Sequence, residues 1–279
     1  MKPQYQHNIT TSFALWLDHH LLDKGEAYTN KTGKLYYYSD PRVSSTYKVF
    51  GSPHKQWVFD SSITGATIPS GVYVSGIFKN RNNGVVLDFI NGRALVSGTT
   101  TGVNVTGSYS VKDFNIYLSN ENEEDLILEN NIEANSKFPQ TGTYIAPYDE
   151  SFPAIYVLSD GNKNTPFAFG GEDETRSLMR AVVFAESSYQ LDGVLSLFSD
   201  STQKVFKLKD FTDFPITEYG DIKSGTYSFD DYYTNPDITT ELYIDDVTAS
   251  KLRDRSKLGS KAYVGFLDFE IIKYRYPRV

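Results

Sequence analysis

The pattern of apolar and polar positions predicts a helix near the start of the chain, within the stretch FALWLDHHLLDKGEAYTN at residues 13–30. Four apolar side chains share one stripe at helical spacing: Phe13, Trp16, Leu17 and Leu21. Leu15 and Leu22 fall on the far side, which indicates that the helix is covered on more than one side. The hydroxyl of Thr11 or Ser12 can cap the start of the helix by accepting a backbone N–H bond.

The following part of the chain predicts β-structure. Gly and Pro recur about every ten residues, a spacing typical of a β-meander or sandwich. Strands are expected at 34–40, 47–50 and 114–119. The acidic, Asn-rich residues 120–136 are expected to form a short helix or an exposed connection.

The clearest local signal is the stretch VVLDFINGRALV, residues 85–96, which predicts a β-hairpin. Asn91 and Gly92 suit the two positive-φ positions of a type I′ turn. A two-residue loop would make Phe89 face Ala94 and Leu87 face Val96.

The second half of the chain mixes strands and helices. Residues 176–187 carry apolar side chains on both faces, which predicts a long central strand. Helical spacing in 188–206 predicts a helix capped by Ser187 or Ser188. The other expected elements are strands at 154–159 and 166–171 around a turn at 160–162, a strand or turn leading into a short helix at 241–255, and a final strand at 262–272.

These elements lack regular βαβ alternation, so the predicted fold class is α+β. The first half is expected to be a β-rich meander or sandwich. The second half is expected to place the N-terminal helix on a mixed or antiparallel sheet. The predicted division has an N-terminal helix and first strand at 1–38 that pack with the second half, a β-rich domain or insertion at 39–136, and an α+β domain at 137–279.

Composition is that of a globular protein with many aromatic side chains. The 279 residues are 39% hydrophobic and 15% aromatic, with 21 Tyr and 18 Phe. Cys is absent, which excludes a disulfide framework, a thiolate nucleophile and a Cys-based metal site. The net charge of −8 would repel long DNA. Neither a signal peptide nor a membrane helix of ~18 apolar residues is expected.

The histidines are the candidate bases and metal ligands: His7, His19, His20 and His54. Because His19 and His20 are neighbours, they point about 100° apart on a helix and cannot easily hold one ion. A helical zinc pair needs His at i and i+4, and the chain has no HExxH, Gly-x-Ser-x-Gly, P-loop or GxGxxG motif. The favoured interpretation is packing, with His20 beside the apolar stripe and His19 towards solvent.

Two acid pairs, Asp230-Asp231 and Asp245-Asp246, are the candidates for a carboxylate-dependent hydrolase. Adjacent acids point to opposite faces of an extended chain, so solvated loop acids are the favoured interpretation. The stretch DGNKN at 160–164 lacks the spaced acids of a calcium loop and is better explained by a tight turn. No catalytic, cofactor-binding or metal-binding residue is therefore predicted, and the protein is expected not to be an enzyme.

Tyrosine clusters favour strand faces and subunit interfaces over sugar-binding platforms, although all three uses suit the residue. The clusters are Tyr36-Tyr37-Tyr38, Tyr232-Tyr233, and Tyr274 with Tyr276.

Three stretches together resemble the neck and tail-completion proteins of tailed bacteriophages, a group that includes tail terminators and sheath-stabilising rings. The stretches are FALWLDHHLLDKGEAYTN, RSLMRAVVFAESSYQLDGVLSLF and AYVGFLDFEI. The resemblance is one of pattern, covers the first ~30 residues and 154–272, and makes 40–120 an insertion or added domain. It implies a non-enzymatic virion protein that forms a six- or twelve-fold ring at the head–tail junction, with neighbouring neck or tail proteins as partners. DNA would pass through the lumen without sequence-specific binding.

Two alternatives stay open at this point. The first is a receptor- or carbohydrate-binding β module that uses the first-half sheet and exposed tyrosines. The second is a hydrolase whose two carboxyl groups, ~5–9.5 Å apart, are assembled by the fold.

Overall fold

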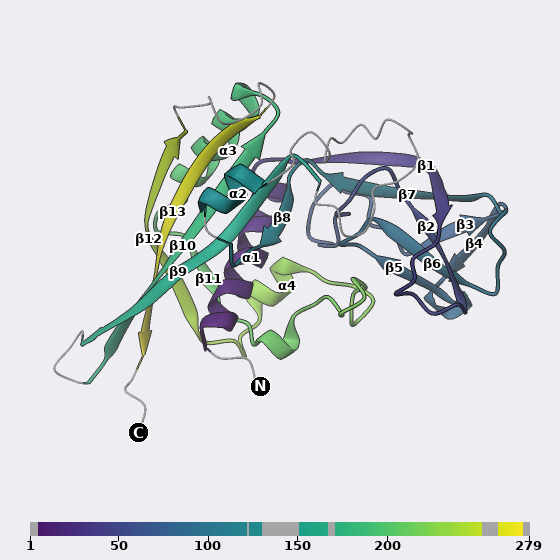
Figure 1. Ribbon diagram of the computed structural model, residues 1–279. Helices are drawn as coiled ribbons and strands as arrows, with labels where there is room; N and C mark the ends of the chain where they lie inside the picture. Colours follow the sequence, from purple (N-terminus) through teal and green to yellow (C-terminus); the bar gives the residue numbers. More distant parts are fainter. Residues whose placement is uncertain (1–4, 122, 130–150, 167–170, 253–261, 276–279) are drawn as a thin grey trace.

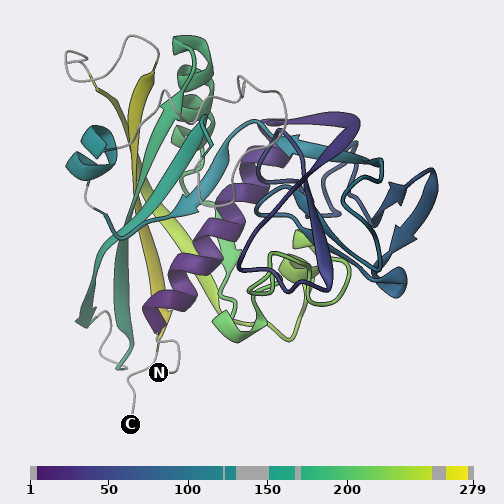
Figure 2. The ribbon, with the colours of Figure 1, turned by 45° about the vertical axis from the view of Figure 1, so that its right-hand side comes forward.

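The computed structural model describes residues 5–121, 123–129, 151–166, 171–252 and 262–275. Two β-sheets meet at helix α1, Tyr5–Asp23, which crosses between them (Figures 1 and 2). The predicted α+β class is confirmed, with most of the described elements being strands.

Helix α1 begins earlier than the predicted cap. Thr11 and Ser12 therefore lie inside the helix, where each hydroxyl bonds to a carbonyl oxygen one turn back. The apolar stripe is buried as expected, and Leu15 and Leu22 on the far side are buried as well. The helix lies against β8 (Asn115–Leu118), β9 (Ala154–Pro166) and β11 (Val205–Lys207) of one sheet. It also contacts the 3-10 turn η2 (Phe211–Asp213) and the short helix α4 (Phe229–Thr234).

The seven-stranded sheet has the order β4-β3-β7-β1-β2-β6-β5, with every neighbouring pair antiparallel. It curls so that β3 and β4 approach β5. Its elements are β1 (Tyr28–Tyr38), β2 (Tyr47–Gly51), β3 (Gly71–Val74), β4 (Ile77–Asn80), the 3-10 turn η1 (Arg81–Asn83), β5 (Val85–Asp88), β6 (Arg93–Ser97) and β7 (Val105–Lys112).

Strands β5 and β6 pair in a register that differs from the predicted one. Leu87 faces Ala94, and Asp88 faces Arg93, so four residues form the loop. Of the Asn-Gly pair, Gly92 alone takes a positive φ, so the loop is not a type I′ turn. The reason is tertiary: the backbone of Phe89 bonds to Trp57 and Gly220, far away in sequence, instead of to β6.

The six-stranded sheet has the order β11-β12-β13-β10-β9-β8 and is mixed, because β8 and β9 run parallel. The predicted central strand is confirmed, since β10 lies between β9 and β13. The strands are β8 (Asn115–Leu118), β9 (Ala154–Pro166), β10 (Asp173–Ala185), β11 (Val205–Lys207), β12 (Glu241–Lys251) and β13 (Tyr263–Arg275).

The remaining helices are short and flank this sheet (Figure 1). They are α2 (Glu123–Glu129), α3 (Ser188–Ser199), the 3-10 turn η2 (Phe211–Asp213) and α4 (Phe229–Thr234). Helix α3 confirms the start of the helix predicted in 188–206, and the hydroxyl of Ser187 accepts the N–H of Gln190 as its cap. The helix ends at Ser199, and Val205–Lys207 form strand β11 instead. The helix buries Leu191, Val194, Leu195 and Phe198 against the sheet.

The predicted turn at 160–162 is wrong, because β9 runs through it without a break. The residues that favour a turn form a β-bulge in β9 instead, where the pairing register shifts between Leu178 and Met179. Gly161 takes a φ of 140° there. Most of the strand predicted at 166–171 and the end of the helix predicted at 241–255 lie outside the described residues, while β12 extends as strand to Lys251.

The predicted segment 1–38 is divided between the two sheets. Helix α1 packs on the six-stranded sheet, but β1 pairs with β2 and β7 of the seven-stranded sheet. Strand β8, expected in the β-rich part, belongs instead to the six-stranded sheet. One continuous apolar core runs from Trp57 and Phe89 through Phe13 to Phe269, which is why a boundary in sequence does not match a boundary in space.

Truncating Phe13 tests the role of α1. The ring of Phe13 lies 4.9 Å from that of Phe269 and 6.2 Å from that of Phe206. We expect Phe13→Ala to lower the free energy of unfolding by about 3–5 kcal/mol, because it leaves a cavity between helix and sheet. Urea denaturation followed by circular dichroism measures this loss. Tyr189→Ala, at a side chain 89% exposed, should change it by less than ~0.5 kcal/mol; equal effects of the two variants would contradict this packing.

Candidate functional site

His19 and His20 make two separate contacts on α1. The Nδ1 atom of His19 lies 2.8 Å from Oδ2 of Asp60, and its ring stacks on Phe229 with centroids 4.2 Å apart. His20 stacks on Trp16, as its predicted place beside the apolar stripe requires. The prediction that His19 faces solvent is wrong: its side chain is only 14% exposed, because the fold brings Asp60 and Phe229 onto it.

The His19–Asp60 pair resembles the base–carboxylate part of a catalytic triad, but its other bonds suit a structural contact. A triad needs a nucleophile at the second ring nitrogen, whereas Nε2 of His19 faces Asp230 at 3.8 Å. Asp60 also accepts hydrogen bonds from Ser62 and from the backbone N–H of Phe229. Burial would raise the pKa of Asp60, but these hydrogen bonds outweigh it and lower the pKa below its usual value.

A buried ion pair beside this contact ties α1 to the seven-stranded sheet. The ammonium of Lys112 lies 2.7 and 2.8 Å from the two carboxylate oxygens of Asp18. It also lies 4.9 Å from the ring centroid of Phe59. Burial raises the pKa of Asp18, and the charge of Lys112 opposes this rise.

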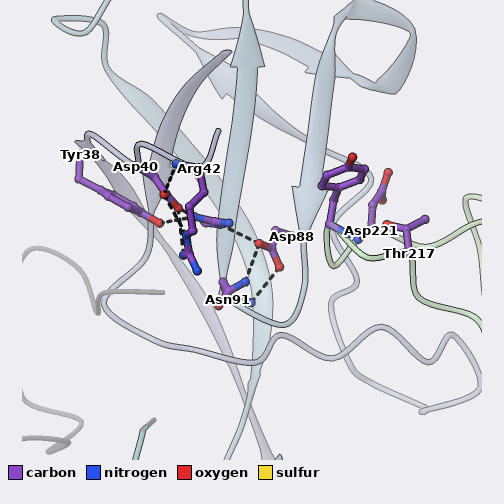
Figure 3. A network of polar contacts seen from close by, with 9 residues as sticks. Tyr38, Asp40, Arg42, Asp88, Asn91, Thr217 and Asp221 are labelled. Carbon is purple, nitrogen blue, oxygen red and sulfur yellow. Dashed lines mark hydrogen bonds and ion pairs between the residues drawn. The ribbon is translucent and has the colours of Figure 1, made fainter. Parts of the chain in front are cut away.

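A second polar network lies between the end of β1 and the β5–β6 loop, where Tyr38, Asp40, Asp88 and Asn91 come together (Figure 3). The guanidinium of Arg93 lies 2.7 Å from carboxylate oxygens of both Asp40 and Asp88, and it donates to the hydroxyl of Tyr38 at 2.9 Å. Asp88 also accepts two hydrogen bonds from Asn91, which holds the loop. Arg42 also pairs with Asp40 from the surface, and together these contacts fix the geometry of the loop.

The charges in this network stabilise one another. Burial disfavours the charged form of Arg93, yet Asp88 and Asp40 outweigh it and raise its pKa. Burial is the main cause that raises the pKa of Tyr38 to about 12, and the charge of Arg93 opposes this rise. Gly220 must be glycine here, because it takes a φ of 79° and a Cβ would lie 1.9 Å from Oδ1 of Asp88.

The two sequence-predicted acid pairs are not brought together as a cleft. Asp230 approaches His19 from α4, and Asp231 donates its backbone N–H to the capping hydroxyl of Ser228. Asp245 lies 3.3 Å from Arg176 on the face of the six-stranded sheet. In the part of the chain that the structure describes, no three His, Asp or Glu side chains are placed to share a metal ion.

The tyrosine clusters are split between core and surface. Tyr38 is buried at Arg93, and buried Tyr232 donates its hydroxyl to the backbone oxygen of Lys207 at 2.6 Å. Tyr274 is exposed and contacts Tyr243 across β12 and β13. Tyr276 lies outside the described residues.

Exposed apolar side chains gather at the hairpin of β3 and β4. Ile77 is 67% exposed and Phe78 is 43% exposed, and the ring of Phe78 packs edge-on against exposed Tyr73. This hairpin lies at the end of the molecule remote from β12 and β13 (Figures 1 and 2). Clustered exposed apolar groups are a mark of interaction surfaces.

Charge is divided unevenly along the chain. Residues 28–112, which form the seven-stranded sheet, hold nine Lys and Arg against three Asp, a net charge of +6. The rest of the chain holds 18 Lys and Arg against 32 Asp and Glu, a net charge of −14. Arg81 with Asp221, 3.1 Å apart, and Lys112 with Asp18 join the two parts. A count by segment would have found this division in the sequence, whereas the total of −8 conceals it.

The chain matches no protein-family model, and no curated protein matches its sequence. None of the helices in the described part of the chain has the length and apolar character needed to cross a membrane.

Breaking the Asp18–Lys112 pair tests its contribution to stability. Lys112→Met leaves a buried carboxylate without its partner, so we expect a loss of about 3–5 kcal/mol in the free energy of unfolding. The double variant Asp18→Asn with Lys112→Met should lose clearly less than the sum of the two single variants. A double-mutant cycle by urea denaturation measures this coupling, and strictly additive losses would contradict it.

The half-buried ring of His20 should make the free energy of unfolding depend on pH. Burial lowers its pKa from 6.5 to about 4, so the unfolded chain takes up a proton between these values that the folded chain does not. The free energy of unfolding should therefore fall as pH falls from 6.5 to 4. His20 contributes at most ~1.4 kcal/mol per pH unit, reduced by the partial exposure of the ring. His20→Gln should flatten this part of the curve, and His7→Gln, at an exposed position, should not; unchanged slopes in both would contradict it.

Proposed function

We propose that this protein is a structural, non-enzymatic virion protein of a tailed bacteriophage, which forms a ring at the neck or head-proximal end of the tail. The observation that carries the proposal is the charge division between residues 28–112 and the rest of the chain. Opposite charge on two different surfaces attracts copies of a chain to one another and orients them.

The position of the charged parts favours a ring over a symmetric dimer. The two sheets lie at opposite ends of the molecule (Figure 1). A two-fold contact made at either end of the molecule would set that end against itself and so bring like charges together, whereas a head-to-tail contact sets the basic end against the acidic end. Head-to-tail contacts close into rings when the rotation between copies closes.

The internal polar contacts also favour a structural role. His19, Asp60 and Asp18 hold α1 between the sheets, and Arg93 holds the β5–β6 loop. These groups would otherwise be the first candidates for acid–base chemistry. The pattern resemblance to neck and tail-completion proteins supplies the place in the virion, with assembly in the host cytoplasm and neighbouring neck or tail proteins as partners.

The β3–β4 hairpin supports a second candidate function, a receptor- or carbohydrate-binding module. Exposed aromatic rings such as Tyr73 and Phe78 suit stacking on sugar rings. Under this alternative the purified chain would bind glycans without forming a ring. A glycan array with the wild-type chain and a Phe78→Ser variant distinguishes the two functions.

Native mass spectrometry with negative-stain imaging tests the ring. We expect a six- or twelve-fold assembly with a central hole at low salt. Raising the ionic strength from 0.01 to 1 M shortens the screening length from about 30 Å to about 3 Å and should dissociate it, because the contact joins opposite charges. A monomer at every salt concentration and at protein concentrations up to about 1 mM would contradict the proposal, as would an assembly strengthened by salt.

A further inference from the structure

We infer that the open edge of strand β12, beside helix α3, receives strand β4 of a second copy of this chain, so that neighbouring subunits share one continuous β-sheet. This inference rests on the proposed self-association and specifies the contact through which it occurs.

The edge of β12 lacks a neighbouring strand over half its length. Strand β11 pairs only with Glu241–Tyr243, and the backbone of Ile244 bonds to residues 203 and 204. From residue 246 to Lys251, β12 pairs with β13 on one side and, among the described residues, with no strand on the other. Alternate N–H and C=O groups of such an edge point outwards and can bind an incoming extended chain.

A groove runs along this edge. Helix α3 forms one wall and β12 the other, and the cavity between them has a volume of about 1040 Å³. Most of the lining side chains are small, and two acidic groups and one ammonium group lie among them. The lining residues are Asp192, Leu195, Ser196, Ser199, Asp200, Ala249, Ser250 and Lys251.

Other edges of the same sheet are closed or blunted. The side-chain amide of Gln56 bonds to both the N–H and the carbonyl of Ile116, which closes the edge of β8. The outer half of β9 carries a register shift, Lys163 and Pro166, features that discourage strand addition. The open part of β12 has no Pro, and its register shift lies before Asp246. Among the described residues, this edge is therefore better suited to pairing than the edges of β8 and β9.

Strand β4 is the matching edge of the other sheet. It is the outermost strand and pairs with β3 alone among the described strands. It exposes Ile77 and Phe78, while Lys79 forms no ion pair within the described part of the chain. Because β4 and β12 lie at opposite ends of the molecule, one copy cannot join its own two edges (Figures 1 and 2). The partner must be a second copy.

Charge selects this pairing. Strand β4 carries the single charged residue Lys79, and the charged residues that line the groove are Asp192, Asp200 and Lys251, a net charge of −1. Lys79 would enter a groove whose rim carries Asp192 and Asp200, where Lys251 already pairs with Asp192. Two copies of the β12 edge would bring acidic rims together, so a symmetric edge-to-edge dimer is disfavoured.

Disulfide cross-linking in this Cys-free chain tests the contact directly. Facing residues of paired strands have Cβ atoms about 4.5–5.5 Å apart, near the range that a disulfide spans. We would make Ala249→Cys and, separately, Ile77→Cys, Phe78→Cys and Lys79→Cys. Ala249→Cys mixed with at least one β4 variant should give a covalent dimer on mild oxidation. Each variant alone should give at least ten-fold less, because the contact joins two different surfaces.

Leu178→Cys is the matched control, because Leu178 is an apolar side chain, 49% exposed, that lies outside the groove. Mixed with the β4 variants it should cross-link at least ten-fold less than Ala249→Cys. Equal cross-linking by both would overturn the inference. A ring that forms without any β4–β12 disulfide would overturn it while leaving the proposed function standing. A chain that stays monomeric and uncross-linked would overturn both.

Two variants that each add one negative charge give an independent measure of the contact. Ile77→Asp should weaken self-association at least ten-fold in sedimentation, because it sets a carboxylate against the acidic groove. Leu178→Asp adds the same charge elsewhere and should change association less than two-fold. Circular dichroism of both variants should match the wild-type chain, since both side chains are exposed. An unaltered association constant for Ile77→Asp would overturn the contact.

Discussion

Helix α1 must bury apolar side chains on more than one side, and this requirement makes two sheets converge on it. Phe13 packs on the six-stranded sheet, while Leu22 joins Val58 and Ile63 in a separate apolar cluster. The polar groups of the helix follow from the same constraint. Asp18 is carried into the interior with its neighbours, so it needs the ammonium of Lys112 to remain charged there.

Local periodicity explains which elements could be predicted from the sequence. Helices α1 and α3 and the central strand β10 each carry an apolar pattern that their own residues determine. The β5–β6 loop could not be predicted this way. Asn91 and Gly92 favour a two-residue turn, but the bonds of Phe89 to distant backbone groups and the network at Arg93 impose a four-residue loop. Tertiary hydrogen bonds outweigh a local preference of about 1 kcal/mol.

The surroundings of the candidate site could not be predicted from neighbouring residues in the sequence, for the same reason. The environment of His19 depends on Asp60 and Phe229, which neighbouring residues do not reveal. The lack of a metal-binding motif around His19 could be read from the sequence, whereas the burial of the His19 side chain could not. The charge division is a different case, since counting residues 28–112 separately reveals it without a structure.

An open strand edge and an uneven distribution of charge can together make association selective. An unprotected strand edge promotes indiscriminate pairing, so proteins normally blunt it. Here the amide of Gln56 closes one edge and Lys163 blunts another, but β12 stays open in the acidic part of the chain. In the proposed contact, like charge would keep two such edges apart, and a basic edge strand would be the favoured partner. Selectivity thus comes from repulsion between identical ends as much as from attraction between different ones.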